Sequence, residues 1–213
     1  MKNHIVLLSS LHPKKLDKDY WEFREIEYLN SFNLLRNFDH FSIIDNTIDS
    51  DSEIINNDLI NAINNFKFPI MYNNNIYNSN LYSINNDYGL VLMLKYFQSY
   101  IKPNINYIFI NGRINNFDIF LNKTVNTSFN NVNLFYKSIY NKEIFSDLFV
   151  INSDYYKNFI KHFENFEEID SFDKYISSYV KNCRSNLLLT KMNILKYYHI
   201  DESDYLNTKL KIY

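Results

Sequence analysis

The sequence predicts an α/β protein: a mostly parallel sheet flanked by helices, with a helical C-terminal part. Three observations predict this class. Short apolar runs alternate with segments of helical periodicity over the first 110 residues. No Gly/Ser linker, internal repeat or block of like charge divides the 213 residues, so a single domain is expected. The hydrophobic content of 46% supplies enough apolar material for a core.

The first half is expected to contain four strands and three helices. The strands are short apolar runs that end in polar residues, and the helices carry apolar residues three or four positions apart. Two helix starts show a capping-box pattern, Asp19 with Glu22 and Ser50 with Glu53. The expected order is strand 4–10, helix 19–37, strand 41–45, helix 52–66, strand 68–72, a helix capped by Asp87, and strand 106–110.

The second half has a different character. Phe117, Ile119 and Leu121 alternate with polar residues, which is typical of a half-exposed strand. Ser153 can cap a further helix. The remaining expected elements are strands at 132–136 and 148–151, and a helical region over 171–199 that breaks near 184–186.

The composition indicates an AT-rich genome. The chain has 35 Asn but one Ala, two Gly and three Pro, and Asn codons are AT-rich whereas those of Ala, Gly and Pro are not. Some giant viruses, protists and host-restricted bacteria have such genomes. Asn-rich stretches are therefore weak evidence for function. The two surviving glycines, Gly89 and Gly112, are expected where a side chain would be costly.

Charge and cysteine content exclude several classes. With a net charge of −2, the chain lacks the excess of basic residues that would indicate a nucleic-acid partner. A single cysteine, Cys183, excludes an intramolecular disulfide and a multi-cysteine zinc cluster. The longest early apolar run, 5–8, is too short for a signal peptide or a membrane span, so a cytoplasmic protein is expected, in the host cytoplasm if it is viral.

Polar side chains gather where three of the predicted strands end. Ligands of open parallel sheets bind beyond the carboxyl ends of the strands, so this convergence is the main functional signal. The alternative is that polar residues simply end strands. The residues concerned are Ser9, Ser10 and His12 after the first strand, Asp45, Asn46 and Asp49 after the second, and Asn111, Gly112 and Arg113 after the fourth.

Other titratable residues are weaker candidates for a functional site. The five histidines lack metal-ligand spacing. Glu22, Glu25 and Glu27 are expected on a solvated helix face, although Glu25 could face the cleft.

Residues 42–55, SIIDNTIDSDSEII, resemble the second-strand motif of the large inverting glycosyltransferase family with a GT-A fold. The resemblance covers about residues 3–123 and extends to the helix start at 86–90 and to the strand end at 107–114. It implies that Asp45 binds the nucleotide of a sugar donor, a UDP- or GDP-sugar, with Ser9, Asp87, Asn111 and Gly112 also at the donor. Because strand-end polar residues usually carry little of a core, replacing Asp45 is expected to remove nucleotide binding and to leave the fold intact.

Arg113 departs from the family pattern. The family has a metal-binding Asp at this position, and the metal (Mn or Mg) holds the donor diphosphate. A guanidinium cannot ligate a cation, but it can pair with phosphates directly. Some viral and bacterial surface-glycan members resemble this chain in having a strand that ends in Gly-Arg. The expectation is therefore a donor site that needs no metal and has no metal ligands, with Arg113 on the diphosphate.

The resemblance implies a hexosyltransferase-type enzyme that moves a sugar from the nucleotide sugar to a glycan or protein-linked acceptor. Residues 1–123 would form the nucleotide-sugar half, and residues 124–213 the acceptor half. Asp118 or Glu168 would act as the base on the acceptor hydroxyl. The alternative is a catalytically inactive binding or assembly protein that keeps the fold. A dinucleotide-binding enzyme is disfavoured because the first strand is not followed by Gly-x-Gly-x-x-Gly.

Overall fold

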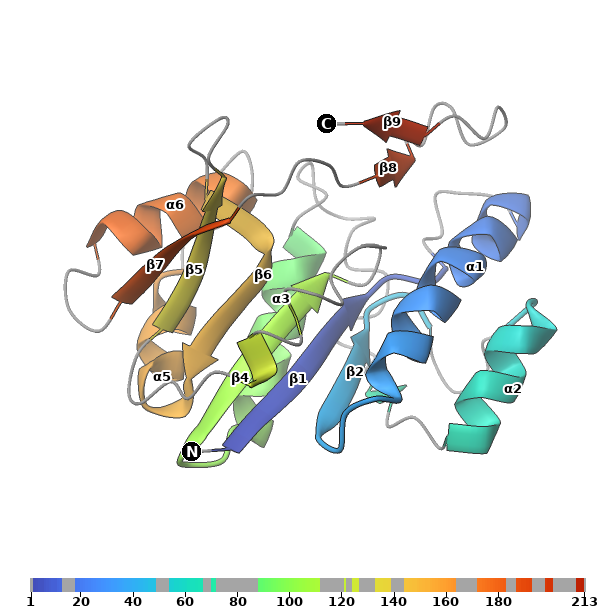
Figure 1. The fold of residues 1–213 in the computed structure, drawn as a ribbon, viewed down its shortest axis with the longest axis horizontal. Coiled ribbons are helices and arrows are strands. Elements are labelled where there is room, and N and C mark those ends of the chain that lie inside the picture. Colours follow the sequence, from blue (N-terminus) through green and yellow to red (C-terminus); the bar gives the residue numbers. More distant parts are fainter. Residues whose placement is uncertain are drawn as a thin grey trace.

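The structure is a computed structural model. It describes residues 2–12, 18–48, 54–66, 70–71, 88–111, 121, 124–126, 133–138, 144–163, 172–182, 187–192, 198–200 and 210–212. Within these ranges the chain forms a sheet with helices on both of its faces (Figure 1).

The first half alternates strand and helix as expected. The strands are β1 (Lys2–Ser9), β2 (Phe41–Asp45), β3 (Ile70–Met71) and β4 (Ile105–Asn111). The helices between them are α1 (Lys18–Leu35), α2 (Asn57–Phe66) and α3 (Tyr88–Phe97), and the short 3-10 helix η2 (Gln98–Tyr100) follows α3. The second half contributes β5 (Asn133–Ser138), β6 (Ile144–Asn152), α5 (Ser153–Lys161), α6 (Phe172–Asn182), β7 (Leu187–Met192), β8 (Tyr198–Ile200) and β9 (Leu210–Ile212).

The main sheet has the order β3-β2-β1-β4-β6-β5-β7. Strands β1 to β4 are mutually parallel, β6 runs antiparallel to both β4 and β5, and β7 is parallel to β5. The described strands therefore confirm a mostly parallel α/β sheet. Its first four strands follow the 3-2-1-4 order with which the doubly wound nucleotide-binding folds begin.

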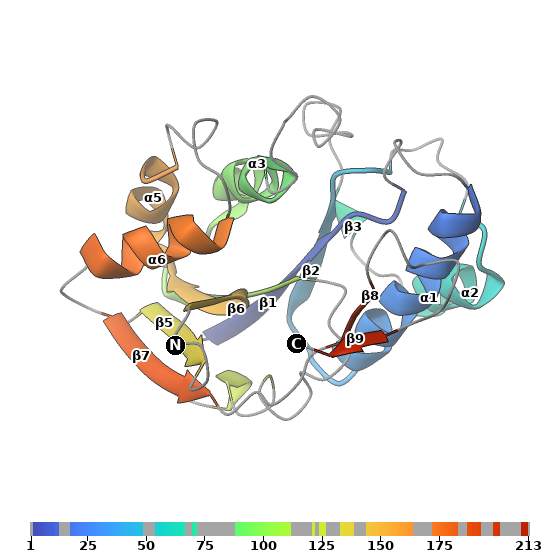
Figure 2. The same cartoon turned by 90° about the horizontal axis from the view of Figure 1, so that it is seen from above.

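The alternation of side chains along the strands builds a core on each face. Even-numbered positions of β1 and odd-numbered positions of β4 face α3, α5 and α6, whereas the intervening positions face α1 and α2. Figure 2 shows these two groups of helices on opposite sides of the sheet. Because both faces are covered, the strands are almost continuously apolar.

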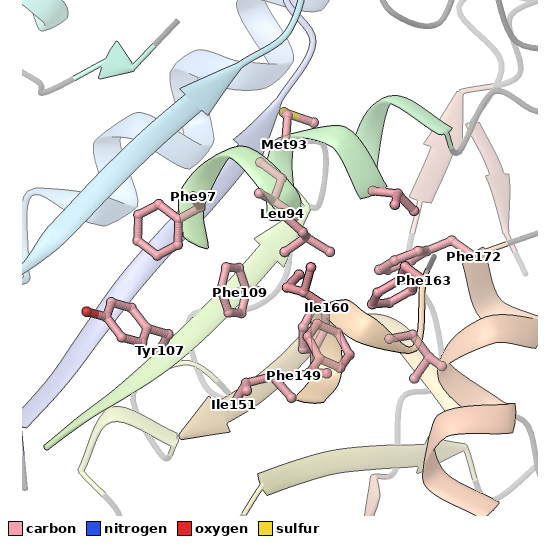
Figure 3. Close-up of a cluster of buried hydrophobic side chains, with 14 of the residues drawn as sticks. Met93, Leu94, Phe97, Tyr107, Phe109, Phe149, Ile151, Ile160, Phe163 and Phe172 are labelled. Carbon is pink, nitrogen blue, oxygen red and sulfur yellow. The ribbon is translucent and has the colours of Figure 1, made fainter. Parts of the chain in front are cut away.

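Aromatic rings fill the core on the α3 side. Phe149 is central: it stacks on Phe109 at 5.2 Å between ring centroids and on Phe135 at 5.9 Å. It also contacts Phe159 from α5 and Phe172 from α6. Figure 3 shows Phe109, Phe149 and Phe172 within this cluster, with Tyr107 at its edge and the Tyr107 hydroxyl pointing away from it.

A row of hydrogen-bonded asparagine side chains, all buried except the half-buried Asn3, crosses the sheet near the amino ends of the parallel strands. Asn152 Nδ2 donates to Asn106 Oδ1 at 2.9 Å, and Asn106 Nδ2 donates to Asn3 Oδ1 at 3.1 Å. At one end, Asn3 donates to the carbonyl of Val125. At the other, the side chain of Asn133 accepts from the backbone of Asn152 and donates to Tyr179.

Several sequence-based expectations for element boundaries are wrong. Helix α2 does not begin at 52: residues 54–56 are not helical, and Asn56 is the cap, because its Oδ1 accepts from the backbone N–H of Leu59 at 2.9 Å. Helix α5 is capped by Asn152, one residue before Ser153. Leu121 is helical rather than extended, and it is fully buried.

The helical expectation for 171–199 holds only for α6. Residues 187–192 form β7, which pairs in parallel with β5, and 198–200 form β8, which pairs with β9. The run Leu187-Leu188-Leu189 is compatible with a helix or a strand, and it forms a strand because it pairs with the edge of the sheet.

Candidate functional site

The carboxyl ends of three strands meet at one edge of the sheet, as the sequence predicts. In the β1–β2 register Ser9 lies beside Asp45, and in the β1–β4 register Leu8 lies beside Asn111. The polar residues that follow β1 and β2 are thereby brought together, and the backbone of Asn111 ends β4 next to them.

Asp45 is the centre of this edge and is completely buried. Its Oδ1 accepts the backbone N–H of Thr47 at 2.7 Å, the hydroxyl of Thr47 at 2.8 Å and the backbone N–H of Ile48 at 3.0 Å. Its Oδ2 accepts the hydroxyl of Ser9 and, at 3.0 Å, the backbone N–H of Leu11. One carboxylate therefore fixes the turns that leave both strands.

This geometry revises the expectation for Asp45. Five donors occupy its two oxygens, so the expectation that Asp45 carries little of the fold is wrong. Ser9 is likewise buried, with its hydroxyl on that carboxylate. Contact of either residue with a nucleotide stays a prediction. In the described geometry both act by shaping the edge that a ligand would meet.

Arg24 of α1 holds the backbone at the same edge of the sheet. Its guanidinium is buried and donates through Nε to the carbonyl of Ser10 at 2.8 Å, with a second bond from Nη2. It also lies 5.8 Å from the ring centroids of both Tyr20 and Tyr28. Burial acts to lower the pKa of Arg24, but Tyr28, Tyr20 and Glu27 outweigh it, so the pKa is raised and the cation is retained.

Glu25 ties α1 to the same region. It is fully buried, forms a hydrogen bond with His12 Nε2 and accepts the backbone N–H of Ile55 at 3.0 Å. It also accepts the backbone N–H of Asn56, the cap of α2. The expectation of a solvated helix face is therefore wrong for Glu25, and also for Glu27, which is buried.

His12 completes this cluster. It is 4% exposed, stacks on Trp21 with 4.8 Å between centroids, and its backbone N–H donates to the hydroxyl of Thr47 at 2.7 Å. The sequence predicts His12 at this edge but does not predict its pairing with Glu25. One feature of the sequence does indicate that Glu25 is buried: it lies on the same helix face as Tyr28 and Phe32, which are core residues.

The described part of the edge offers no ready metal ligands. No three His, Cys, Asp or Glu side chains gather among the described residues so as to hold a metal ion. The buried carboxylates of Asp45 and Glu25 already accept several donors each, so neither fits a divalent cation without breaking the turns it holds.

Several predicted site residues lie outside the described residues: Asp87, Gly112, Arg113, Asp118 and Glu168. Asn111 is described only in its backbone, as the last residue of β4. Their roles at a donor or acceptor stay predictions. Gly89 can be placed: it is buried in the first turn of α3, where a side chain would meet the core, as the sequence predicts.

The fold is Rossmann-like, of the kind seen in nucleotidyltransferases and GT-A glycosyltransferases, and comparison with solved structures shows this directly. A glucose-1-phosphate thymidylyltransferase from Bacillus anthracis, solved with a sucrose, aligns with a TM-score of 0.53 and 10% identity, over 90% of this chain and 87% of its own. A CMP:2-keto-3-deoxy-manno-octonic acid synthetase complexed with CTP aligns with a TM-score of 0.54 and 9% identity, over 97% and 96%.

The glycosyltransferase GlyE of Streptococcus pneumoniae aligns less well, with a TM-score of 0.47 and 10% identity, over 89% of this chain and 45% of its own. No protein-family model and no curated protein matches the sequence. Within the part of the chain that the structure describes, no helix is long and apolar enough to cross a bilayer.

Proposed function

We propose that this chain is a transferase that uses a nucleotide sugar, bound beyond the carboxyl ends of β1, β2 and β4. The observation that carries the proposal is the meeting of these three strand ends, with Ser9 beside Asp45 and Leu8 beside Asn111 in register. In open sheets of this topology such an edge is where ligands bind. The two solved structures with TM-scores above 0.5 support it, since one is a glucose-1-phosphate thymidylyltransferase and the other a synthetase held with CTP.

The reaction we propose is glycosyl transfer to a glycan or protein-linked acceptor. The acceptor hydroxyl oxygen attacks the anomeric carbon of the sugar, and the bond from that carbon to the diphosphate oxygen breaks. A carboxylate, Asp118 or Glu168, takes the hydroxyl proton. The nucleoside diphosphate leaves, and the guanidinium of Arg113 offsets the charge that develops on it.

The edge described above would position the donor. The backbone after β1 and β2 is held by Asp45, so the groups that meet a UDP- or GDP-nucleotide are presented in fixed turns. Asn111 and Gly112 would let the backbone approach the diphosphate closely. Because Arg113 supplies positive charge where the resembled family has a metal ligand, we propose that Mn or Mg is dispensable.

Two other functions fit the fold. The first is nucleotidyl transfer, in which an oxygen of a sugar or sugar phosphate attacks the α-phosphorus of a nucleoside triphosphate and pyrophosphate leaves. The two full-length structural similarities favour it, because one is to a glucose-1-phosphate thymidylyltransferase and the other to a CMP:2-keto-3-deoxy-manno-octonic acid synthetase held with CTP. The second is an inactive binding or assembly protein, favoured by the arginine in place of the metal aspartate.

The experiment that distinguishes these functions measures which leaving group is released. The full chain is incubated with UDP- and GDP-sugars, and separately with nucleoside triphosphates and sugar phosphates, each with and without Mn and with EDTA. Release of a nucleoside diphosphate, enhanced by a glycan acceptor, supports glycosyl transfer. Release of pyrophosphate would replace it with nucleotidyl transfer. If a nucleoside diphosphate raises the thermal stability but no product forms under any of these conditions, the result would support the inactive binding or assembly protein.

A further inference from the structure

A pocket lies at the opposite edge of the sheet, at the amino ends of β1, β2 and β4. It has a volume of about 430 Å³, which is in the range of pockets that hold small-molecule ligands. Strand β1 runs from Lys2 to Ser9, so at about 3.3 Å per residue the two edges are roughly 20 Å apart. A ligand here cannot be the substrate at the carboxyl edge.

The described lining of this pocket is basic. It contains two lysines, Lys2 and Lys102, and two histidines, His4 and His40, and no carboxylate is among the described lining residues. Both lysines and His40 are exposed at the rim, whereas His4 is partly buried inside. Polar groups of Asn3 and Ser42 and the rings of Phe97, Tyr100 and Tyr107 complete it.

The inner wall is held rigidly. His4 Nε2 is hydrogen-bonded to the hydroxyl of Ser42 at 2.9 Å, and its ring packs on Tyr107 at 5.6 Å between centroids. The Tyr107 hydroxyl, which Figure 3 shows pointing out of the core, accepts the backbone N–H of Lys102 at 2.8 Å. The turn that carries Lys102 includes Asn104 with φ of 60°, a conformation that asparagine adopts more readily than most residues.

The aromatic wall is Tyr100. Its ring is 44% exposed, one of two large hydrophobic side chains so exposed among the described residues. It stacks on Phe97 with 6.2 Å between centroids, and its hydroxyl is hydrogen-bonded to that of Tyr96 at 2.8 Å. That hydrogen bond raises the pKa of Tyr100, so the hydroxyl stays neutral and does not repel an anion.

The basic groups of the pocket also act on His4. Burial, and the nearby charges of His40 and Lys102, lower the pKa of His4 to about 4. An anion placed among these groups would remove part of that repulsion. Its binding should therefore raise the pKa of His4.

We propose that this pocket is a binding site for a phosphorylated small molecule. Its phosphate would be held between Lys2, His40 and Lys102, and its ring would lie on Tyr100. A phosphate monoester carries close to two negative charges, which matches two ammonium groups, and lysine is a common phosphate ligand. A pre-positioned tyrosine ring offers a flat apolar surface at low entropic cost.

The test is a titration of the full chain followed by NMR of the histidine rings, at constant ionic strength. The probes are inorganic phosphate and phenyl phosphate. The signals of His4 and His40 should shift saturably, and that of His162, which follows α5, packs on Tyr175 and Tyr179 of α6 and does not line the pocket, should not move. Phenyl phosphate should bind at least about threefold more tightly than phosphate, because its ring adds a contact with the ring of Tyr100.

Three variants make the result decisive. Lys102→Gln should raise the Kd for phosphate at least about threefold. Lys157→Gln, an exposed lysine on α5, is the matched control and should leave the Kd unchanged. Tyr100→Ala should remove the advantage of phenyl phosphate. Unsaturable shifts shared by His4 and His162, or equal effects of the two lysine variants, would overturn the proposal, as would a phenyl advantage that survives Tyr100→Ala.

Discussion

Replacing Asp45 by asparagine should destabilise the protein markedly, although the two side chains have nearly the same shape. The amide oxygen can keep the three bonds now made by Oδ1, from the N–H and hydroxyl of Thr47 and the N–H of Ile48. The new amide nitrogen then faces the Ser9 hydroxyl, which can rotate to accept, and the Leu11 N–H, which cannot. The N–H of Leu11 and one amide hydrogen are then left unpaired and three charge-assisted bonds become neutral, so we expect a loss of about 2–4 kcal/mol.

The assay is urea unfolding at neutral pH, with the midpoint and m-value compared with those of the unchanged protein. Asp39→Asn is the matched control, because Asp39 is exposed and its replacement should change stability by less than about 0.5 kcal/mol. Asp45→Ala, which leaves the donors of Leu11, Thr47 and Ile48 unpaired, should cost more than Asp45→Asn. If Asp45→Asn is as stable as Asp39→Asn, then Asp45 does not hold the two turns and the reasoning fails.

Four further outcomes are expected. Arg113→Ala should weaken binding of the donor diphosphate by about 1.5–3 kcal/mol, measured calorimetrically, with Arg113→Lys restoring only part; strict manganese dependence with an indifferent arginine would contradict this. Gly112→Val should reduce turnover more than it lowers Tm, and a fully active variant would refute the role of this glycine. Phe149→Ala should cost about 3–5 kcal/mol in urea unfolding, since it removes a ring at the centre of the core. Because the pKa of His4 is lowered, the unfolded chain binds more protons, so stability should fall as pH drops from 6.5 to about 4; His4→Gln should flatten that slope, and an unchanged slope would contradict it.

Periodicity and capping patterns predicted most of the first half of the fold, because most elements there are bounded by a clear polar or capping residue. Strand β2 was predicted at its observed limits, and α3 after Asp87. The misjudged region, 187–192, lacks such boundaries: a leucine run has no period, and only the partner strand β5 makes it extended. The start of α2 was missed for a related reason, since a distant carboxylate, Glu25, binds the N–H of Asn56 at the cap.

The meeting of the strand ends was predictable from the sequence, but the contacts of the residues there were not. Parallel strands bring their carboxyl ends together whatever follows them, so Ser9 and Asp45 had to meet. Whether a carboxylate there faces a ligand or the protein's own backbone depends on where the next turn places its N–H groups. Three such groups converge on Asp45, and sequence spacing alone does not reveal this.

The asparagine row across the sheet has a consequence for how the strands find their alignment during folding. Strands β1, β4 and β6 are apolar on both faces, so sliding one of them by two residues would still bury leucine, isoleucine and phenylalanine. Only in the native alignment do Asn3, Asn106 and Asn152 lie directly opposite one another. A slipped arrangement leaves the buried amides of Asn106 and Asn152 without these partners, at about 1–3 kcal/mol for each unpaired group. The hydrogen bonds among these three asparagines therefore favour the native register of the strands over slipped registers.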